Sequence, residues 1–211
     1  SIRTPPMGNC AKRTSGAPPA KESKPKMLSS GPPDAGGQML IRFLRGEGPD
    51  SENRMLMDIL RWGDMDMERV HNYVQWIFPT DEASMFNMDA PLMTPAVQEI
   101  CRNDPVIQQN FDHILARFLS FLGLQMAEND GKFKVSRAKH FDTRVPDCWS
   151  SMFGMGRNHN WLRISRVLHC LGMIGKKAEQ QALMQFLETM VSDFPDIRSA
   201  VPHWRGRAQE G

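Results

Sequence analysis

The chain has 211 residues, and its 26 lysines and arginines nearly balance its 24 aspartates and glutamates, giving a formal net charge of +2. A chain of this length is expected to form one domain with a tail and to bury a substantial core. The near-neutral charge argues against a chain-wide attraction to nucleic acid or to a membrane surface, and we expect no nucleic-acid partner. No apolar run approaches the roughly 18 residues that a membrane-spanning helix needs.

The cysteines lie far apart in the sequence and form no C-x-x-C pair; they are Cys10, Cys101, Cys148 and Cys170. This spacing argues against a zinc ribbon and against a small disulfide-stapled secreted domain, so we expect reduced thiols in an intracellular protein. The sequence contains no H-x-x-x-H or H-E-x-x-H pattern and no glycine-rich phosphate-binding motif. We therefore predict neither a metal site nor a cofactor.

Residues 1–38 are rich in proline, glycine, serine and lysine and almost free of recurring apolar residues. Such a segment cannot bury enough surface to offset the entropy lost on ordering. The sequence therefore predicts a flexible basic tail over 1–38, ahead of the folded part of the chain.

A short motif in this tail resembles a lipidation site. Met7, Gly8, Asn9 and Cys10 follow one another as at the start of a protein that is myristoylated on glycine and palmitoylated on a nearby cysteine. Two lipid chains, or one chain with basic residues, give stable anchoring, so Gly8 and Cys10 predict peripheral membrane contact. Met7 is not the first residue, however, and Lys12 stands where the myristoylation motif requires Ser or Thr. A remnant near an organelle import signal is the alternative interpretation.

Residues 39–195 carry apolar residues at helical spacing, and we expect a mostly α fold with a single helical domain there. Several helices have recognisable ends. Ser51 is expected to cap a helix over 51–62, and Asp66 one over 66–78 that stops before Pro79. The pairs Thr94-Pro95 and Asp104-Pro105 are typical of helix starts. The expected helices up to this point are 38–44, 51–62, 66–78, 94–102 and 104–122, the last ended by Gly123.

The second half is expected to begin with a short β-hairpin. Asn129, Asp130 and Gly131 are typical of a tight turn, here between two short extended pieces within 124–135. Helices are then expected over 136–145, before Pro146, and over 158–171 and 176–193. The C-terminal segment 196–211 contains Pro202 and is expected to be irregular.

Two motifs stand out in these helices. The first, at 71–79, reads H-N-Y-V-Q-W-I-F-P, and the second, at 158–172, reads N-H-N-W-L-R-I-S-R-V-L-H-C-L-G. Together they resemble the conserved domain of the opioid growth factor receptor family, whose members carry an H-x-Y-I-Q-W-L-F-P block followed by a helix of the pattern HN-x-x-R-I-T-R-I-L-x-x-L-G. The resemblance implies a non-classical intracellular receptor, found at the nucleus and membranes, that binds an opioid pentapeptide.

The polar residues of the two motifs are the candidates for ligand binding. On one continuous helix, His71 and Gln75 are four residues apart and can share a site, and Trp76 keeps a polar N–H beside its apolar ring. Arg163 and Arg166 can clamp a carboxylate or phosphate, or pair with acidic residues of an adjoining helix. Burial in the core is the alternative for the first motif. Neither motif contains a catalytic constellation, so we predict no catalytic residue.

These observations favour a protein that is not an enzyme. We expect a peptide- or protein-binding module, scaffold or signalling-receptor-like domain with a protein or peptide partner. The alternative is a structural subunit of a larger assembly, organellar or at a membrane. We expect an intracellular location, in the cytoplasm or nucleus or peripherally at a membrane.

Overall fold

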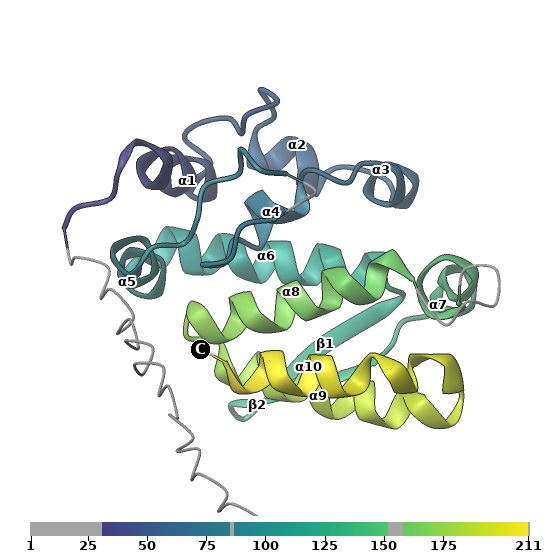
Figure 1. The fold of residues 1–211 in the computed structure, drawn as a ribbon. Helices are drawn as coiled ribbons and strands as arrows, with labels where there is room; N and C mark the ends of the chain where they lie inside the picture. Colours follow the sequence, from purple (N-terminus) through teal and green to yellow (C-terminus); the bar gives the residue numbers. More distant parts are fainter. Residues whose placement is uncertain (1–30, 85–86, 152–157, 211) are drawn as a thin grey trace, which may run out of the picture.

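The computed structural model describes residues 31–84, 87–151 and 158–210. Over these ranges the chain is mostly helical, with one two-stranded antiparallel sheet, so the predicted fold class is confirmed (Figure 1). Gly8, Cys10 and the rest of 1–30 lie outside the described residues, so the flexible tail and its lipidation stay predictions. No helix of the described part is long and apolar enough to cross a membrane.

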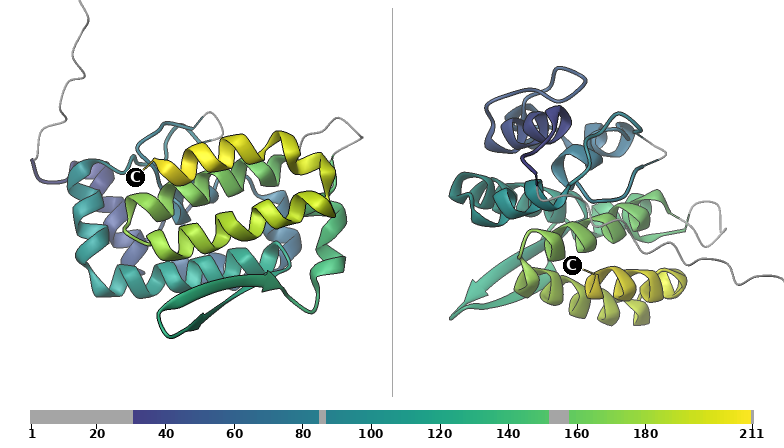
Figure 2. Two further views of the ribbon diagram at one scale, coloured as in Figure 1. Left: turned by 90° about the horizontal axis from the view of Figure 1, so that it is seen from below. Right: turned by 60° about the vertical axis from the view of Figure 1, so that its left-hand side comes forward.

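Helix α6 (Pro105–Phe121) and helix α8 (His159–Met173) form the middle of the molecule. On one side of α6 lie α1 (Ala35–Arg45), α2 (Leu56–Leu60), α3 (Asp64–Arg69) and α4 (Val74–Ile77), as Figure 1 shows. On the far side of α8 lie α9 (Lys177–Thr189) and α10 (Val201–Gln209), and Figure 2 shows these three helices side by side. The remaining helix of the N-terminal half, α5 (Pro95–Asn103), contacts both α1 and α6.

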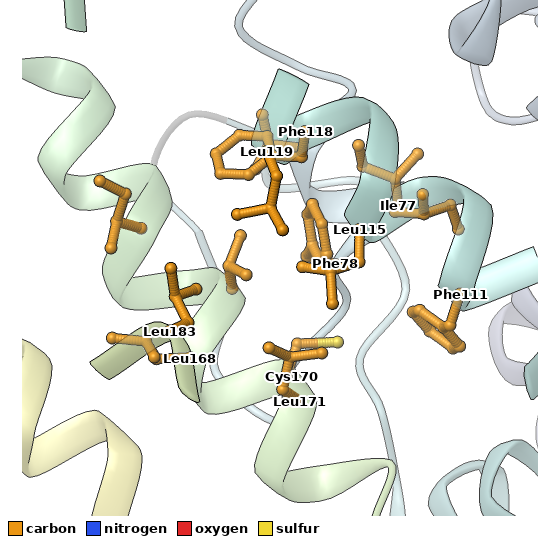
Figure 3. Packing of buried hydrophobic residues seen from close by; sticks show 14 of the residues in the cluster. Ile77, Phe78, Phe111, Leu115, Phe118, Leu119, Leu168, Cys170, Leu171 and Leu183 are labelled. Carbon is orange, nitrogen blue, oxygen red and sulfur yellow. The ribbon is translucent and has the colours of Figure 1, made fainter. Parts of the chain in front are cut away.

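The core lies between these layers, and the apolar stripe predicted for the longest helix is at its centre. Ile107, Phe111, Ile114 and Phe118 of α6 are fully buried. The ring of Phe118 packs edge-on against Phe78, with ring centroids 5.3 Å apart. Leucines of α8 and α9 complete the same cluster (Figure 3).

Local signals correctly predicted several element ends. The side chain of Asp104 caps α6 by accepting hydrogen bonds from the backbone N–H groups of Val106 and Ile107, at 2.9 and 3.1 Å. Beyond α6, Gly123 has a φ of +76°, and a Cβ there would lie 2.8 Å from the Cα of Phe141. Only glycine fits this position, because both the backbone conformation and the close approach exclude a side chain.

The predicted hairpin is also confirmed. Strands β1 (Leu124–Asn129) and β2 (Lys132–Arg137) pair antiparallel, with Asn129 opposite Lys132. Asp130 and Gly131 form the two-residue loop, with φ values of 51° and 73°. Positive φ at both loop residues matches the right-handed twist of the strands, which explains why an Asp-Gly pair stands here.

Two predicted N-terminal helices differ from the structure. The helix expected over 51–62 is shortened to α2, because the Asp50 carboxylate accepts hydrogen bonds from the backbone N–H groups of Glu52 and Arg54 and holds that stretch as a loop. The helix expected over 66–78 is divided into α3 and α4. Arg163 of α8 donates to the carbonyl oxygens of Met67 and Val70, which a continuous helix would use for its own bonds.

The limits predicted for a helix over 136–145 are also wrong. Its first residues belong to β2, and α7 (Phe141–Arg144) is a single turn. The chain then continues through Pro146 as a π-helical turn (Val145–Trp149) instead of stopping. Proline is tolerated there because it lies in the first turn, where its missing N–H removes no helical bond.

The C-terminal segment is ordered, contrary to the prediction for 196–211. A 3₁₀-helix (Pro195–Ser199) leads into α10, and Pro202 occupies the first turn of that helix. Trp204 of α10 is fully buried, and its indole N–H donates to the carbonyl oxygen of Trp161 in α8 at 2.9 Å. The tail is also shorter than the predicted 1–38, since α1 begins at Ala35 with Asp34 as its cap.

We predict that Trp204→Ala lowers the free energy of unfolding by about 3–5 kcal/mol, because it leaves a cavity and removes a buried hydrogen bond. Chemical denaturation followed by circular dichroism measures this. The matched control is Arg205→Ala on the same helix, which removes only an exposed ion pair with Glu188 and should cost less than about 1 kcal/mol. Equal denaturation midpoints for the two variants would contradict the packing of α10.

Candidate functional site

A cavity of about 490 Å³ lies where the segment 71–84 meets α8 and Arg207 of α10. Four of the five predicted ligand-binding residues line it: His71 and Gln75 from the first motif, and Arg163 and Arg166 from the second. The other lining residues are Val74, Thr80, Glu82, Ala83, Ser84, His159, Leu162, Ser165 and His169. The two motifs, far apart in sequence, therefore meet at one site.

The fifth predicted residue, Trp76, does not line the cavity. It is fully buried and packs edge-on against Phe43 of α1, with ring centroids 5.3 Å apart. Its indole nitrogen is buried and has no hydrogen-bond partner within the described residues. The structure thus places Trp76 in the core, where the alternative interpretation of the first motif had placed it.

Arg163 is buried beneath the cavity and fastens α8 to the break between α3 and α4. Its Nη1 donates to the carbonyl oxygen of Met67 at 2.7 Å, and its Nη2 to that of Val70 at 2.9 Å. The guanidinium carbon also lies 5.6 Å from the centre of the Tyr73 ring. The sequence predicted either an anion clamp or pairing with acidic residues, but Arg163 instead satisfies backbone carbonyls.

Arg166, one turn further along α8, is held differently. Its Nε donates to the carbonyl oxygen of Phe78 at 2.7 Å. Among the residues that the structure describes, its two terminal nitrogens have no hydrogen-bond partner, and no carboxylate lies within ion-pair distance. Burial lowers the pKa of Arg166, although the charge of Glu82 opposes that shift. The cavity therefore contains a largely buried cation without a close counter-ion.

Gln75 carries a second unsatisfied group. Its side chain is almost completely buried, at 4% exposure, and its Nε2 donates to the hydroxyl of Ser84 at 3.0 Å. Its Oε1 is buried and has no partner within the described part of the chain. Gln75 thus ties the segment after α4 to that helix and leaves one buried acceptor unpaired.

Arg207 closes one end of the cavity with a set of ion pairs. It donates to both carboxylate oxygens of Glu82, at 2.7 Å each, and to Glu210 at 2.6 Å. The hydrogen bonds from Arg207 lower the pKa of Glu82. His169 lies beside this group, with its Nδ1 3.4 Å from an Arg207 nitrogen.

Glu82, His169 and Glu210 have the residue types of a metal site, and their ligand atoms lie within 4.8 Å of one another. Arg207 already lies among them and donates to both carboxylates through hydrogen bonds of normal length. A metal ion would have to displace this guanidinium. The geometry therefore fits an ion-pair network and not a metal centre.

His71 and His159 line another part of the cavity, and their ring centroids lie 5.3 Å apart. His159 Nε2 lies 2.9 Å from a carboxylate oxygen of Glu68, and Asn160 donates to the other oxygen at 3.0 Å. Burial tends to raise the pKa of Glu68, but these two contacts outweigh it, and the net shift is downward. Burial, and after it the positive charge of Arg163, lowers the pKa of His71. His71 is therefore neutral near pH 7.

Sequence reasoning missed His169, Glu82 and Arg207. A signal existed for His169, which follows Arg166 by three residues and so lies on a neighbouring part of the same helix face. Glu82 lies in an irregular segment, and Arg207 lies in a segment that we expected to be irregular. Their positions depend on tertiary packing, which no local pattern reveals.

Comparison with known proteins gives a consistent family match. Residues 50–205 match the family described as "Opioid growth factor receptor (OGFr) conserved region". The chain is 31% identical to the opioid growth factor receptor of Homo sapiens over 138 residues, which cover 64% of this chain and 19% of that protein. It is 30% identical to the opioid growth factor receptor of Mus musculus over 175 residues, 79% of this chain and 26% of that protein.

A second group of relatives is named differently. The chain is 26% identical to opioid growth factor receptor-like protein 1 of Mus musculus over 167 residues, 76% of this chain and 34% of that protein. The chain thus spans about a fifth to a third of the length of the curated relatives it matches. No solved structure matches. The resemblance carried by the two motifs is confirmed.

We predict that the stabilising effect of Glu68 disappears in acid. Because the pKa of Glu68 is lower in the folded protein than its ordinary value of 4.5, its contribution is present above that value and is lost as the pH falls through the folded pKa. The free energies of unfolding of the native protein and of Glu68→Gln should therefore differ at pH 7, and the difference should shrink as the pH falls below 4.5 and through the folded pKa. A difference that stays constant or grows in acid would contradict this assignment.

Proposed function

We propose that this chain, which belongs to the opioid growth factor receptor family, acts through its helical domain as a binding module for a peptide or protein partner and catalyses no reaction. The relatives named above are receptors by name, which supports a binding role for the region they share with this chain. The matched region is the helical domain itself, over residues 50–205.

The observation that carries the proposal is the cavity formed by the two motifs. Ligand sites combine an apolar lining with a few polar groups that lack protein partners. Val74 and Leu162 supply apolar surface here, and Leu162 is 60% exposed at the cavity although it lies on a helix that is otherwise largely buried. Arg166 supplies the polar group, since its two terminal nitrogens have no partner among the described residues.

The absence of an activated nucleophile in the described part of the cavity supports a role without catalysis. Ser165 uses its hydroxyl to donate to the carbonyl oxygen of Trp161, in its own helix. The described cysteines are buried, and burial raises the pKa of Cys101 and of Cys148 to about 12. Thiols with such pKa values are protonated and unreactive at neutral pH.

The cavity is suited to a partner that inserts one small group from a larger surface. Its volume of about 490 Å³ is at the small end of ligand sites, and exposed Leu162 extends the apolar surface beyond it. A partner that covers Leu162 while one of its side chains or its chain end enters the cavity would use both features.

The test places a photo-crosslinking residue at position 162 of the full chain in its native cells and, as a matched control, at Val106, which is 48% exposed on α6. We expect a partner crosslinked from position 162 and absent from position 106. The purified partner should then bind the native chain saturably, with Leu162→Glu weakening the interaction at least about tenfold and Val106→Glu leaving it unchanged.

The proposal fails if no saturable partner is found, or if the partner binds the Leu162→Glu variant as tightly as the native chain. A partner whose binding is lost instead in Val106→Glu would place the interface on α6. Circular dichroism of both variants establishes that any lost binding does not come from unfolding.

A further inference from the structure

Arg166 has the geometry of a pre-positioned anion anchor. Its bond from Nε to the carbonyl oxygen of Phe78 fixes the orientation of the guanidinium. That bond leaves both terminal nitrogens without a partner among the described residues, on a side chain that lines the cavity. Two adjacent N–H donors on one rigid plane match the two oxygens of a carboxylate.

The charges around Arg166 do not neutralise it. Glu82 is the acidic residue of the cavity lining, and both of its oxygens are already bonded to Arg207. Arg207 itself adds a like charge to the neighbourhood of Arg166. A bound anion would supply the missing counter-charge, and in a partly dry cavity such a contact is stronger than in water.

The same cavity also offers apolar surface to a ligand. Val74 and Leu162 line it together with Arg166, and Leu162 is 60% exposed. The lining thus matches two groups that occur together in an amino-acid residue: a carboxylate and an apolar side chain.

We propose that the cavity binds a carboxylate-bearing peptide residue, with Arg166 receiving the carboxylate and Val74 and Leu162 contacting the apolar part. This deepens the proposed function and rests on it, since it names the chemical group that a peptide or protein partner would insert. The apolar lining suits a carboxylate on an apolar residue better than a doubly charged inorganic phosphate.

The test uses small probes and the isotopically labelled full chain, observed by NMR. The first probe, N-acetyl-leucine, carries both groups, and N-acetyl-leucinamide is its neutral match. We expect saturable shifts of the Arg166 Nε–H signal with N-acetyl-leucine, and binding of the amide at least about tenfold weaker, because one charge-assisted pair is lost. The α-amide of N-acetyl-glutamate, whose carboxylate is on the side chain, distinguishes an acidic side chain from a chain end as the natural source.

Variants link the binding to Arg166. Arg166→Gln should weaken the binding of N-acetyl-leucine at least about tenfold. Arg166→Lys keeps the charge but not the planar pair of donors, and its affinity for N-acetyl-leucine should lie between those of the native chain and of Arg166→Gln. The control is Arg198→Gln, which removes an exposed arginine outside the cavity lining. This variant should bind N-acetyl-leucine as tightly as the native chain does. If Arg166→Gln does not fold, the comparison of the two leucine probes on the native chain decides the question.

Equal binding of N-acetyl-leucine and its amide, tighter binding of inorganic phosphate, or unchanged affinity in a folded Arg166→Gln variant would overturn this inference. These outcomes are separate from the test of the proposed function. A partner that needs Leu162, together with probes that do not bind, would leave the binding module standing and remove the carboxylate site.

Discussion

The buried guanidinium of Arg163 is the constraint on which the site depends. A charge at 7% exposure is tolerated only if its donors are used, and Arg163 bonds to the carbonyl oxygens of Met67 and Val70 and to the side chain of Asn160. Those two carbonyls belong to a stretch whose sequence favours one continuous helix. The bonds from α8 therefore decide where that helix stops and hold the break between α3 and α4 against α8.

The cavity follows from this break. In one continuous helix, His71 and Gln75 would lie on a single face. Because of the break, His71 lies in the segment between α3 and α4 and Gln75 lies in α4, and both line the cavity with residues of α8. Arg166 repeats the arrangement one turn later, with one bond to the carbonyl oxygen of Phe78, but its two terminal nitrogens have no partner among the described residues. The second motif thus contains one arginine used for structure and one that we propose binds a ligand, and sequence spacing alone does not distinguish them.

Sequence reasoning succeeded where the signal was local. The caps at Thr94 and Asp104, the stripe of α6 and the Asp-Gly turn of the hairpin specify their elements without help from the rest of the chain. It failed where tertiary bonds override propensity, as at Asp50, at the α3–α4 break and at α10, which Trp204 anchors to α8. Among the predicted site residues, Trp76 has a polar N–H by residue type, but the sequence could not show that this group faces the core.

The most direct test of this account is amide hydrogen exchange of the Arg163→Met variant, which keeps an unbranched, flexible side chain and removes the donors. We predict that amides within 67–78 exchange at least about tenfold faster than in the native chain, equivalent to about 1.4 kcal/mol, while those of α6 are unchanged. The matched control is Arg102→Met, which also removes a donor to a backbone carbonyl, that of Met173. Unchanged protection of 67–78 in Arg163→Met would contradict the claim that Arg163 holds the break and the cavity.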